Sequence, residues 1–170
     1  GDLEGVSPGL YRINQNSNPA ADFFESLEIQ LLEEVDGISD IVGSELSDTI
    51  AANDVGNLIE TKGGSDTIFA AGGDDQVFAG AGDDSIHGGD GNDLIYGDSS
   101  SSAGKDAFIF GNDIIVGGEG NDRIYGQGGD DIIFGGAGND IINAGEGNDT
   151  VYASAGLNII EDGYGEYLDG

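Results

Sequence analysis

The stretch that decides the fold is "GGEGNDRIYGQGGDDIIFGGAGNDIINAGEGNDTVY", which runs from Gly117 to Tyr152. Glycine, acidic and aliphatic residues recur in it with a period of nine residues. Because a repeat of fixed length indicates a unit of structure that stacks on its own copies, the period has to be established before secondary structure is assigned. We number the places of the repeat from one to nine, with Gly117 at the first place.

The same period extends in both directions from this stretch. It predicts units that start at residues 43, 52, 61, 70, 79 and 88 and, after a break, at residues 117, 126, 135, 144 and 153. The eighth place is Ile or Val in every unit, and the fourth place is Gly in all but the first two. Asn57 and Asn158 take the sixth place in two outer units. The sixth place of the others is acidic and holds Asp48, Asp66, Asp75, Asp84, Asp93, Asp122, Asp131, Asp140 and Asp149.

The break between Tyr96 and Gly117 is slightly longer than a pair of units. "FIFGNDIIV" (108–116) fits as a weak unit, with Asp113 at the sixth place and Ile115 at the eighth. "GDSSSSAGKDA" (97–107) is then a bulged, enlarged turn. An alternative register puts Gly104, Asp106 and Phe108 at the fourth, sixth and eighth places, and the sequence does not decide between the two.

The chemistry of the nine places predicts strands and turns. Places seven to nine are short β-branched, aliphatic or aromatic stretches around an inward aliphatic side chain, which is typical of strands. Places one to six are rich in residues that form turns, with Gly where positive φ is needed and Asn or Asp at the fifth place, where we expect it to be tolerated. Three strand residues are too few for a stable hairpin, but they can form a coil of two units. We therefore expect an all-β coil, or roll, with two short-stranded parallel sheets and two units, or about 18 residues, per turn of the coil.

The chain divides into three parts by this pattern. We expect the roll to span 37–161 with the insertion at 97–107, an acidic, solvated tail at 162–170, and a capping segment at 1–36, where no repeat is found. Within the cap, "NPAADFFESLEIQLLEEV" could start a helix after Pro19, or "LEIQLLEEV" could be a strand that leads into the roll. The helix would place Phe24, Leu27, Leu31 and Val35 on one face. In both cases, apolar residues would cover the first coil, where an open sheet edge invites aggregation.

Net charge limits the partners of the chain. It has 34 acidic residues against four Lys and Arg, a formal net charge of -30. This charge disfavours binding to nucleic acids and to anionic membranes, and it makes cations the natural partners. The chain has no Cys, which excludes disulfides and thiolate metal sites. No apolar run approaches the roughly 18 residues of a membrane span.

The repeat also predicts which cation is bound. One aliphatic side chain in each unit makes a thin core, and stacked coils place the sixth-place carboxylates above one another. A cation between the carboxylates would offset both weaknesses. Ca²⁺ accepts six to eight oxygen ligands in a flexible arrangement, whereas Mg²⁺ requires a stricter octahedron and Zn²⁺ favours His or Cys. We therefore expect multiple Ca²⁺ ions.

The units resemble a known repeat. "GGDGNDLIY", "GGEGNDRIY" and "GGAGNDIIN" match GGxGxDxUx at every defined place, so the chain resembles the RTX, or haemolysin-type, calcium-binding nonapeptide family from Gly43 to about Glu161. The resemblance implies an all-β, right-handed parallel β-roll in which sixth-place Asp residues and turn carbonyls hold Ca²⁺ between coils. It implies the pairs Asp48 with Asp66, Asp66 with Asp84, and Asp122 with Asp140 at one edge, and Asp75 with Asp93, Asp93 with Asp113, Asp113 with Asp131, and Asp131 with Asp149 at the other. The glycines of the implied sites are Gly64, Gly73, Gly80, Gly82, Gly89, Gly91, Gly118, Gly120, Gly129, Gly136, Gly138, Gly145 and Gly147.

The resemblance further implies a biological role. Members of this family belong to bacterial proteins that are exported unfolded by type I secretion and fold on Ca²⁺ outside the cell. The first two units lack the glycines, and Asn57 and Asn158 carry no charge, so we expect the outermost sites to be weak or empty.

Two alternative functions compete with calcium binding. We find no HExxH, no GxSxG and no nucleophile with a plausible base, and His87 falls at an outward ninth place, so we do not expect an enzyme. An adhesin or carbohydrate-binding segment is the other alternative. We expect an apolar outer face on one sheet with Phe78, Tyr96, Phe134 and Tyr152, which could dock another domain or a glycan. Ordinary strand composition, or cover from the flanks of the chain, would explain the same residues.

Overall fold

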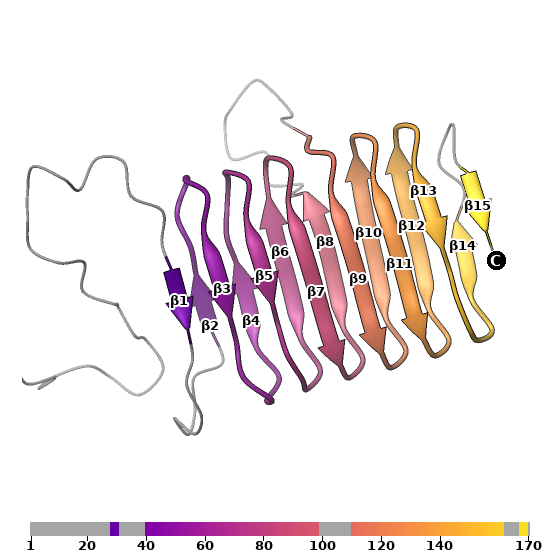
Figure 1. Cartoon of the computed structure of the whole chain (residues 1–170), viewed down its shortest axis with the longest axis horizontal. Coiled ribbons are helices and arrows are strands. Elements are labelled where there is room, and N and C mark those ends of the chain that lie inside the picture. Colours follow the sequence, from indigo (N-terminus) through magenta and orange to yellow (C-terminus); the bar gives the residue numbers. More distant parts are fainter. Residues whose placement is uncertain (1–27, 31–39, 99–109, 162–166, 170) are drawn as a thin grey trace, which may run out of the picture.

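The structure is a computed structural model that describes residues 28–30, 40–98, 110–161 and 167–169. These residues form short strands joined by turns, stacked along one axis (Figure 1). No helix in these described ranges is long and apolar enough to cross a membrane.

The strands form two parallel sheets, which the chain enters in turn. The odd sheet has eight strands, β1 (Glu28–Gln30), β3 (Thr49–Ala51), β5 (Thr67–Phe69), β7 (Ser85–Asp90), β9 (Ile114–Glu119), β11 (Ile132–Ala137), β13 (Thr150–Tyr152) and β15 (Tyr167–Asp169). The even sheet has seven, β2 (Asp40–Val42), β4 (Leu58–Glu60), β6 (Gln76–Gly80), β8 (Leu94–Asp98), β10 (Arg123–Gly128), β12 (Ile141–Glu146) and β14 (Ile159–Glu161). Consecutive strands lie in opposite sheets, so the architecture is the parallel β-roll that the nine-residue period predicts.

The eighth place forms the core, as predicted. Ile50 pairs with Ile68 in the odd sheet and Ile59 with Val77 in the even sheet, each pair one coil apart. Small first-place residues such as Ala70 fill the space beside them. The buried aliphatic residues are Ile41, Ile50, Ile59, Ile68, Val77, Ile86, Ile95, Ile115, Ile124, Ile133, Ile142 and Val151, and Ile160 is partly buried.

The insertion lies inside one repeat unit. Ile86 pairs with Ile68 on one side and with Ile115 on the other, so the step along the chain to Ile115 is longer than the regular two units. Gly97 and Asp98 supply the first two places of the interrupted unit, and 110–116 supply the other seven. Asp113 and Ile115 thus take the sixth and eighth places, as predicted. The additional residues are 99–109, a different insertion from the expected 97–107, and they lie outside the described residues together with the alternative register.

Our assignment of units to sheets was wrong beyond residue 97. The predicted pair of Asp93 with Asp113 requires unit 108–116 to lie in the same sheet as unit 88–96, but β9 lies in the odd sheet and β8 in the even sheet. The reason is that the described strands alternate between the sheets with each unit, before and after the insertion. Consequently Phe78 and Tyr96 lie on the even sheet, whereas Phe134 and Tyr152 lie on the odd sheet. The predicted single aromatic face does not exist.

Both ends of the roll add a strand to the odd sheet. Strand β1 pairs in parallel with β3, which gives Glu28–Gln30 the strand rather than the helix of the two alternatives. The helix residues Phe24, Leu27, Leu31 and Val35 lie outside the described residues. Strand β15 pairs in parallel with β13, within the segment where we expected a solvated tail.

Candidate functional site

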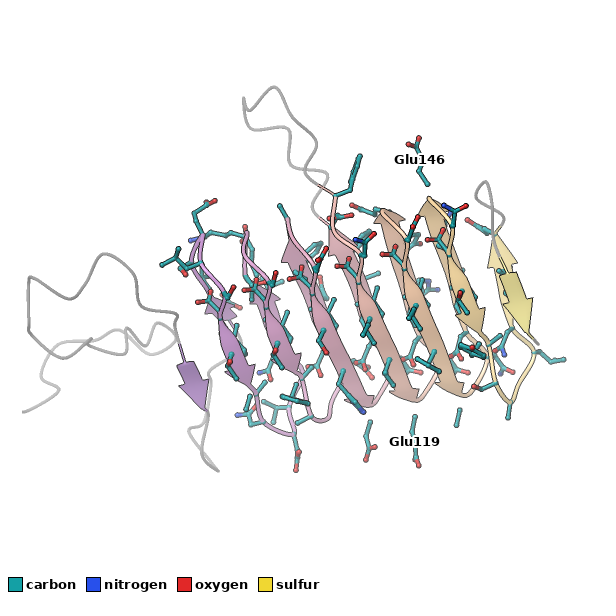
Figure 2. The ribbon with its side chains drawn as sticks, turned by 45° about the horizontal axis from the view of Figure 1, so that its top comes forward. Glu119 and Glu146 are labelled. Atoms are coloured by element: carbon teal, nitrogen blue, oxygen red, sulfur yellow. The ribbon has the colours of Figure 1, made fainter. Side chains whose placement is uncertain are left out.

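The sixth-place residues form two ladders, one along each edge of the roll. We call the turns that lead into odd strands the odd edge and those that lead into even strands the even edge. Figure 2 shows carboxylate oxygens along both, with Glu146 of the odd edge and Glu119 of the even edge on opposite sides. The odd edge holds Asp48, Asp66, Asp84, Asp113, Asp131 and Asp149, and the even edge holds Asn57, Asp75, Asp93, Asp122, Asp140 and Asn158.

This arrangement corrects one of the predicted pairs. Asp93 does not lie beside Asp113, because the two are on opposite edges. The N–H of Asp84 donates to Oδ1 of Asp113 (2.9 Å), and the N–H of Asp93 donates to Oδ1 of Asp122 (2.9 Å). The other six predicted pairs are neighbours in the ladders. Beyond the insertion, however, the predicted edges were exchanged: Asp122 and Asp140 continue the ladder of Asp93, and the pairs from Asp113 to Asp149 continue that of Asp84.

The two oxygens of each inner carboxylate have different surroundings. Oδ1 accepts a hydrogen bond from the backbone N–H of the sixth-place residue one coil earlier, as Asp131 does from Asp113 (2.8 Å). Oδ2 is buried and has no hydrogen-bond partner, a costly state for a charged oxygen. In the described part of the chain, this holds for Oδ2 of Asp66, Asp75, Asp84, Asp93, Asp113, Asp122, Asp131, Asp140 and Asp149.

Burial makes these carboxylates hard to ionise. It raises the pKa of Asp113 to about 8, and repulsion by neighbouring carboxylates adds to the effect. Burial also raises the pKa of Asp75, Asp84 and Asp131 to about 7 and that of Asp122 to about 6. The pKa values of Asp66, Asp93, Asp140 and Asp149 are raised for the same reason. A positive charge beside Oδ2 would reverse this effect.

A backbone oxygen lies close to each of several free carboxylate oxygens. A Cβ added at Gly117 would collide with Oδ2 of Asp122 and with the carbonyl oxygen of Gly135 in the next coil. The same holds at Gly126 for Oδ2 of Asp131 and the carbonyl of Ala144. A carboxylate oxygen and a carbonyl oxygen therefore converge at the first place of the turn, and both are hard ligands.

At the ends of the roll, protein donors satisfy the equivalent oxygens. Ser44 donates its N–H to Oδ2 of Asp48 (2.7 Å), and the Lys62 ammonium group donates to the carbonyl of Gly43 (3.0 Å). At the other end, Nδ2 of Asn158 donates to the first-place carbonyl of its own unit (2.8 Å). The outermost turns thus differ from the inner turns in how their oxygens are satisfied.

The predicted turn glycines allow the turns to stack closely. All thirteen have positive φ, at the second or fourth place. At Gly120, with φ of +138°, a Cβ would also collide with the carbonyl oxygen of Gly91 in the preceding coil. The fifth place, where we expected Asn or Asp to tolerate positive φ, does not take it in the described residues.

The fifth place instead forms a second pair of ladders that the sequence analysis missed. Asn148 donates its N–H (2.9 Å) and Nδ2 (3.1 Å) to Oδ1 of Asp130, and these bonds lower the pKa of Asp130. Asn92 donates in the same way to Asp74. The recurrence of Asp and Asn at the fifth place was a visible signal for this role.

Asp98 is a further buried carboxylate that the sequence analysis missed. It is 1% exposed, and burial raises its pKa to about 6. Unlike the inner sixth-place residues, it has partners for both oxygens, the N–H groups of Gly111 and Gly128. An acid at the second place, where glycine recurs, was the signal that could have identified it.

Comparison with known families agrees with this geometry. The sequence model of the RTX calcium-binding nonapeptide repeat (4 copies) matches residues 42–77, 52–86, 70–101, 110–142 and 125–160. The chain belongs to the RTX calcium-binding repeat family. No curated protein and no solved structure matches it.

RTX repeats bind calcium, and the donors of this roll fit that ion. The free Oδ2 atoms and the first-place carbonyls are hard oxygen ligands, which Ca²⁺ prefers. Within the described residues, no three His, Cys, Asp or Glu side chains gather as a metal-binding group. Backbone carbonyls would therefore have to complete each RTX site, a donor set that suits Ca²⁺ and not Zn²⁺.

Proposed function

We propose that this chain is a calcium-folding module of a secreted bacterial protein, and that it supports type I secretion and stability outside the cell. The observation that carries the proposal is the set of nine buried Oδ2 atoms that have no hydrogen-bond partner. In the folded roll at neutral pH, each is an unbalanced charge or a protonated acid. Ca²⁺ between the coils would satisfy these oxygens. The buried charge that destabilises the calcium-free roll would then stabilise the calcium-bound roll.

The inner turns are the proposed binding sites. On the odd edge, the ligands are the carboxylates from Asp66 to Asp149, and on the even edge those from Asp75 to Asp140, each shared between neighbouring coils. Carbonyls of the turn glycines complete the coordination. The outermost turns, where Ser44, Lys62 and Asn158 already satisfy the oxygens, are proposed to bind weakly or not at all.

The same chemistry supports the proposed role in secretion. A glycine-rich chain with a net charge of -30 has little tendency to collapse without a cation. Where Ca²⁺ is scarce, as inside a bacterial cell, it would remain unfolded and competent for export. Where Ca²⁺ is abundant, binding free energy becomes folding free energy.

The module itself is proposed to be non-catalytic. The repeat already accounts for the buried sixth-place acids, and His87 is an exposed residue on the outer side of β7. The family to which the chain belongs is defined by calcium binding.

The structure gives no support to the alternative of glycan binding. The outward apolar residues are divided between two sheets. In the even sheet, Phe78 and Tyr125 stack on opposite sides of Tyr96, with ring centroids 5.1 Å and 4.8 Å apart. Both faces of Tyr96, which a sugar would need for stacking, are therefore covered by its neighbours.

A calcium titration of the metal-stripped chain tests the proposal. We expect a cooperative gain of β signal in far-UV circular dichroism at or below millimolar Ca²⁺, and no such gain with Mg²⁺ at the same concentration. A chain that has full β signal after chelation, or that folds equally well with Mg²⁺, would contradict it.

A further inference from the structure

The coil that contains the insertion has an unusual hydrogen-bond pattern. Elsewhere, the N–H of the fourth-place glycine donates to the third-place carbonyl of the next coil, as Gly129 does to Glu146 (2.9 Å) and Gly120 to Ala137 (2.8 Å). The N–H of the third place donates to the second-place carbonyl of the preceding coil, as Ala81 does to Lys62 (3.0 Å). These two bonds hold each turn to its neighbours.

Both bonds are replaced at the insertion. Gly111, at the fourth place, donates its N–H to Oδ1 of Asp98 (3.0 Å). Gly128, at the third place of the next coil, donates its N–H to Oδ2 of Asp98 (3.2 Å). A side-chain carboxylate thus takes the place of two main-chain carbonyls, and it binds one donor in its own coil and one in the coil that follows.

The backbone around Asp98 departs from the repeat in the same region. The pairing between β8 and β10 ends at Tyr96 and Tyr125, whereas β10 remains paired with β12 as far as Gly128. Gly111 lacks the positive φ of the other fourth-place glycines from Gly64 onward. The carboxylate therefore bridges a stretch of this edge where the pairing of β8 with β10 has ended.

The ring of Phe110 packs against the backbone in the same region. A Cβ added at Gly128 would lie only 2.7 Å from Cγ of Phe110, so the aromatic ring lies directly against this glycine. Asp113, only three residues after Phe110, nevertheless keeps both regular ladder bonds, to Asp84 (2.9 Å) and to Asp131 (2.8 Å).

We propose that Asp98 is a positioning residue that keeps the interrupted coil in the form of a calcium turn around Asp113. The two charge-assisted hydrogen bonds of Asp98 fix the start of the unit (Gly97 and Asp98) to its continuation at Gly111 and to the next coil at Gly128. The insertion at 99–109 can then be accommodated without loss of the ladder. This inference rests on the proposed calcium function, because it assigns Asp98 a role in that site.

A cycle of four proteins tests the inference: the unmodified chain, Asp98→Gly, a deletion of 99–109, and the combination of both. The deletion joins Asp98 to Phe110 and restores a nine-residue unit. Glycine is the regular residue at the second place, so Asp98→Gly should leave a regular turn once the insertion is deleted. Asp90→Gly, which removes an exposed acid from an uninterrupted turn, is the matched control.

We expect Asp98→Gly to lose one or two bound Ca²⁺ ions, counted by native mass spectrometry. We also expect amide exchange at Gly111 and Gly128 to become about tenfold faster or more, the effect of losing a buried hydrogen bond. The same substitution in the deletion background should leave the ion count unchanged, and Asp90→Gly should do so in the full chain. Equal losses in both backgrounds, or none in either, would overturn the inference.

A conservative variant keeps the test decisive if Asp98→Gly does not fold. Asp98→Asn retains one acceptor oxygen, but its Nδ2 cannot accept a hydrogen bond. We expect faster exchange at only one of the two glycine amides, and equal exchange at both would overturn the inference. Absence of Ca²⁺ binding by the unmodified chain would contradict the proposed function. An Asp98→Gly variant that binds all its ions at an unchanged midpoint would contradict only the role of Asp98.

Discussion

At the scale of the residue, a sixth-place carboxylate has opposite effects with and without a cation. Asp113 illustrates this best, because burial raises its pKa to about 8. Without a cation, its ionised form is a charge removed from water, which opposes folding. With Ca²⁺ bound, the same charge is a ligand that belongs to two neighbouring sites.

Asp113→Asn should therefore change stability in opposite directions. Without Ca²⁺, the variant should have at least as much β structure as the unmodified chain, because the ionisable group is gone. With saturating Ca²⁺ it should be less stable than the unmodified chain by about 2 to 4 kcal/mol and should bind up to two ions fewer. Far-UV circular dichroism in EDTA measures the first effect, and urea denaturation at saturating Ca²⁺ measures the second. Glu119→Gln removes one exposed charge from the opposite edge and is the control, which should change stability little in either condition. If Glu119→Gln lost as much stability with Ca²⁺ as Asp113→Asn, the change in net charge alone would be responsible.

Gly120 is a second residue whose substitution has a defined cost. Its φ of +138° and the nearby carbonyl of Gly91 leave no room for a Cβ. We expect Gly120→Ala to lower the stability of the calcium-loaded roll by roughly 2 kcal/mol or more. Thermal denaturation in saturating Ca²⁺ measures this loss. Glu119→Ala, at the preceding exposed place, should cost much less, and an equal cost would show that the turn tolerates a side chain at Gly120.

At the scale of the element, the outward aromatic stack adds stability independently of calcium. Tyr96 lies between Phe78 and Tyr125, with interplanar angles of 6° and 10°. Tyr96→Ala removes both contacts and should lower stability by about 1 to 3 kcal/mol, in proportion to two aromatic pairs. Urea denaturation at saturating Ca²⁺ checks this value. Phe69→Ala removes an exposed ring that only tilts toward His87, at 6.4 Å, and should cost less. A larger loss from Phe69→Ala than from Tyr96→Ala would contradict a role for the stack.

The sequence predicted the elements better than their assignment to sheets. The aliphatic eighth place identified a strand in each unit, because burial of one side chain per unit leaves an unmistakable period. The unit around Asp113 was also located correctly. The sheet of each later unit was not, because it depends on whether the insertion counts as a unit of its own, and composition alone does not show which sheet the chain enters after it.

The candidate site was likewise predictable in part. The sixth-place acids recur strictly and were identified one by one. Hydrogen bonds made across coils leave weaker signals, since the two partners are far apart in the sequence. In the sequence, the fifth-place residues Asn148 and Asp130 are indistinguishable from ordinary turn residues, and Asp98 falls within the predicted bulge.

At the scale of the whole molecule, the negative charge is concentrated on the edges. In β3 to β13, the outward seventh and ninth places of the odd sheet hold no Asp or Glu. The sixth-place ladders, by contrast, place a carboxylate in nearly every turn of both edges. Repulsion therefore acts mainly along the axis of the roll, between coils, which is where bound cations would act against it.

Protons should substitute for calcium in this arrangement. The pKa of Asp75, Asp84 and Asp131 is raised to about 7 and that of Asp113 to about 8, compared with an ordinary value of 3.8. At pH values between 3.8 and the raised pKa, these carboxyl groups keep protons in the calcium-free roll that they have lost in the unfolded chain. The resulting stability is fully present below about pH 4 and is lost as the pH rises through about 7 to 8.

We therefore expect the calcium-free chain to gain β structure when the pH is lowered from 8 to 5, because protonation removes the buried charge that otherwise opposes folding. Far-UV circular dichroism in EDTA measures the gain, and pH 5 stays above the pI of about 4.1. High salt at pH 8 is the control, since it screens exposed charges but cannot protonate buried carboxylates, and it should restore much less structure. If salt were as effective as acid, repulsion over the whole surface would be the obstacle to folding. If neither restored β signal, the roll would require the ion itself as a ligand and not only the loss of charge.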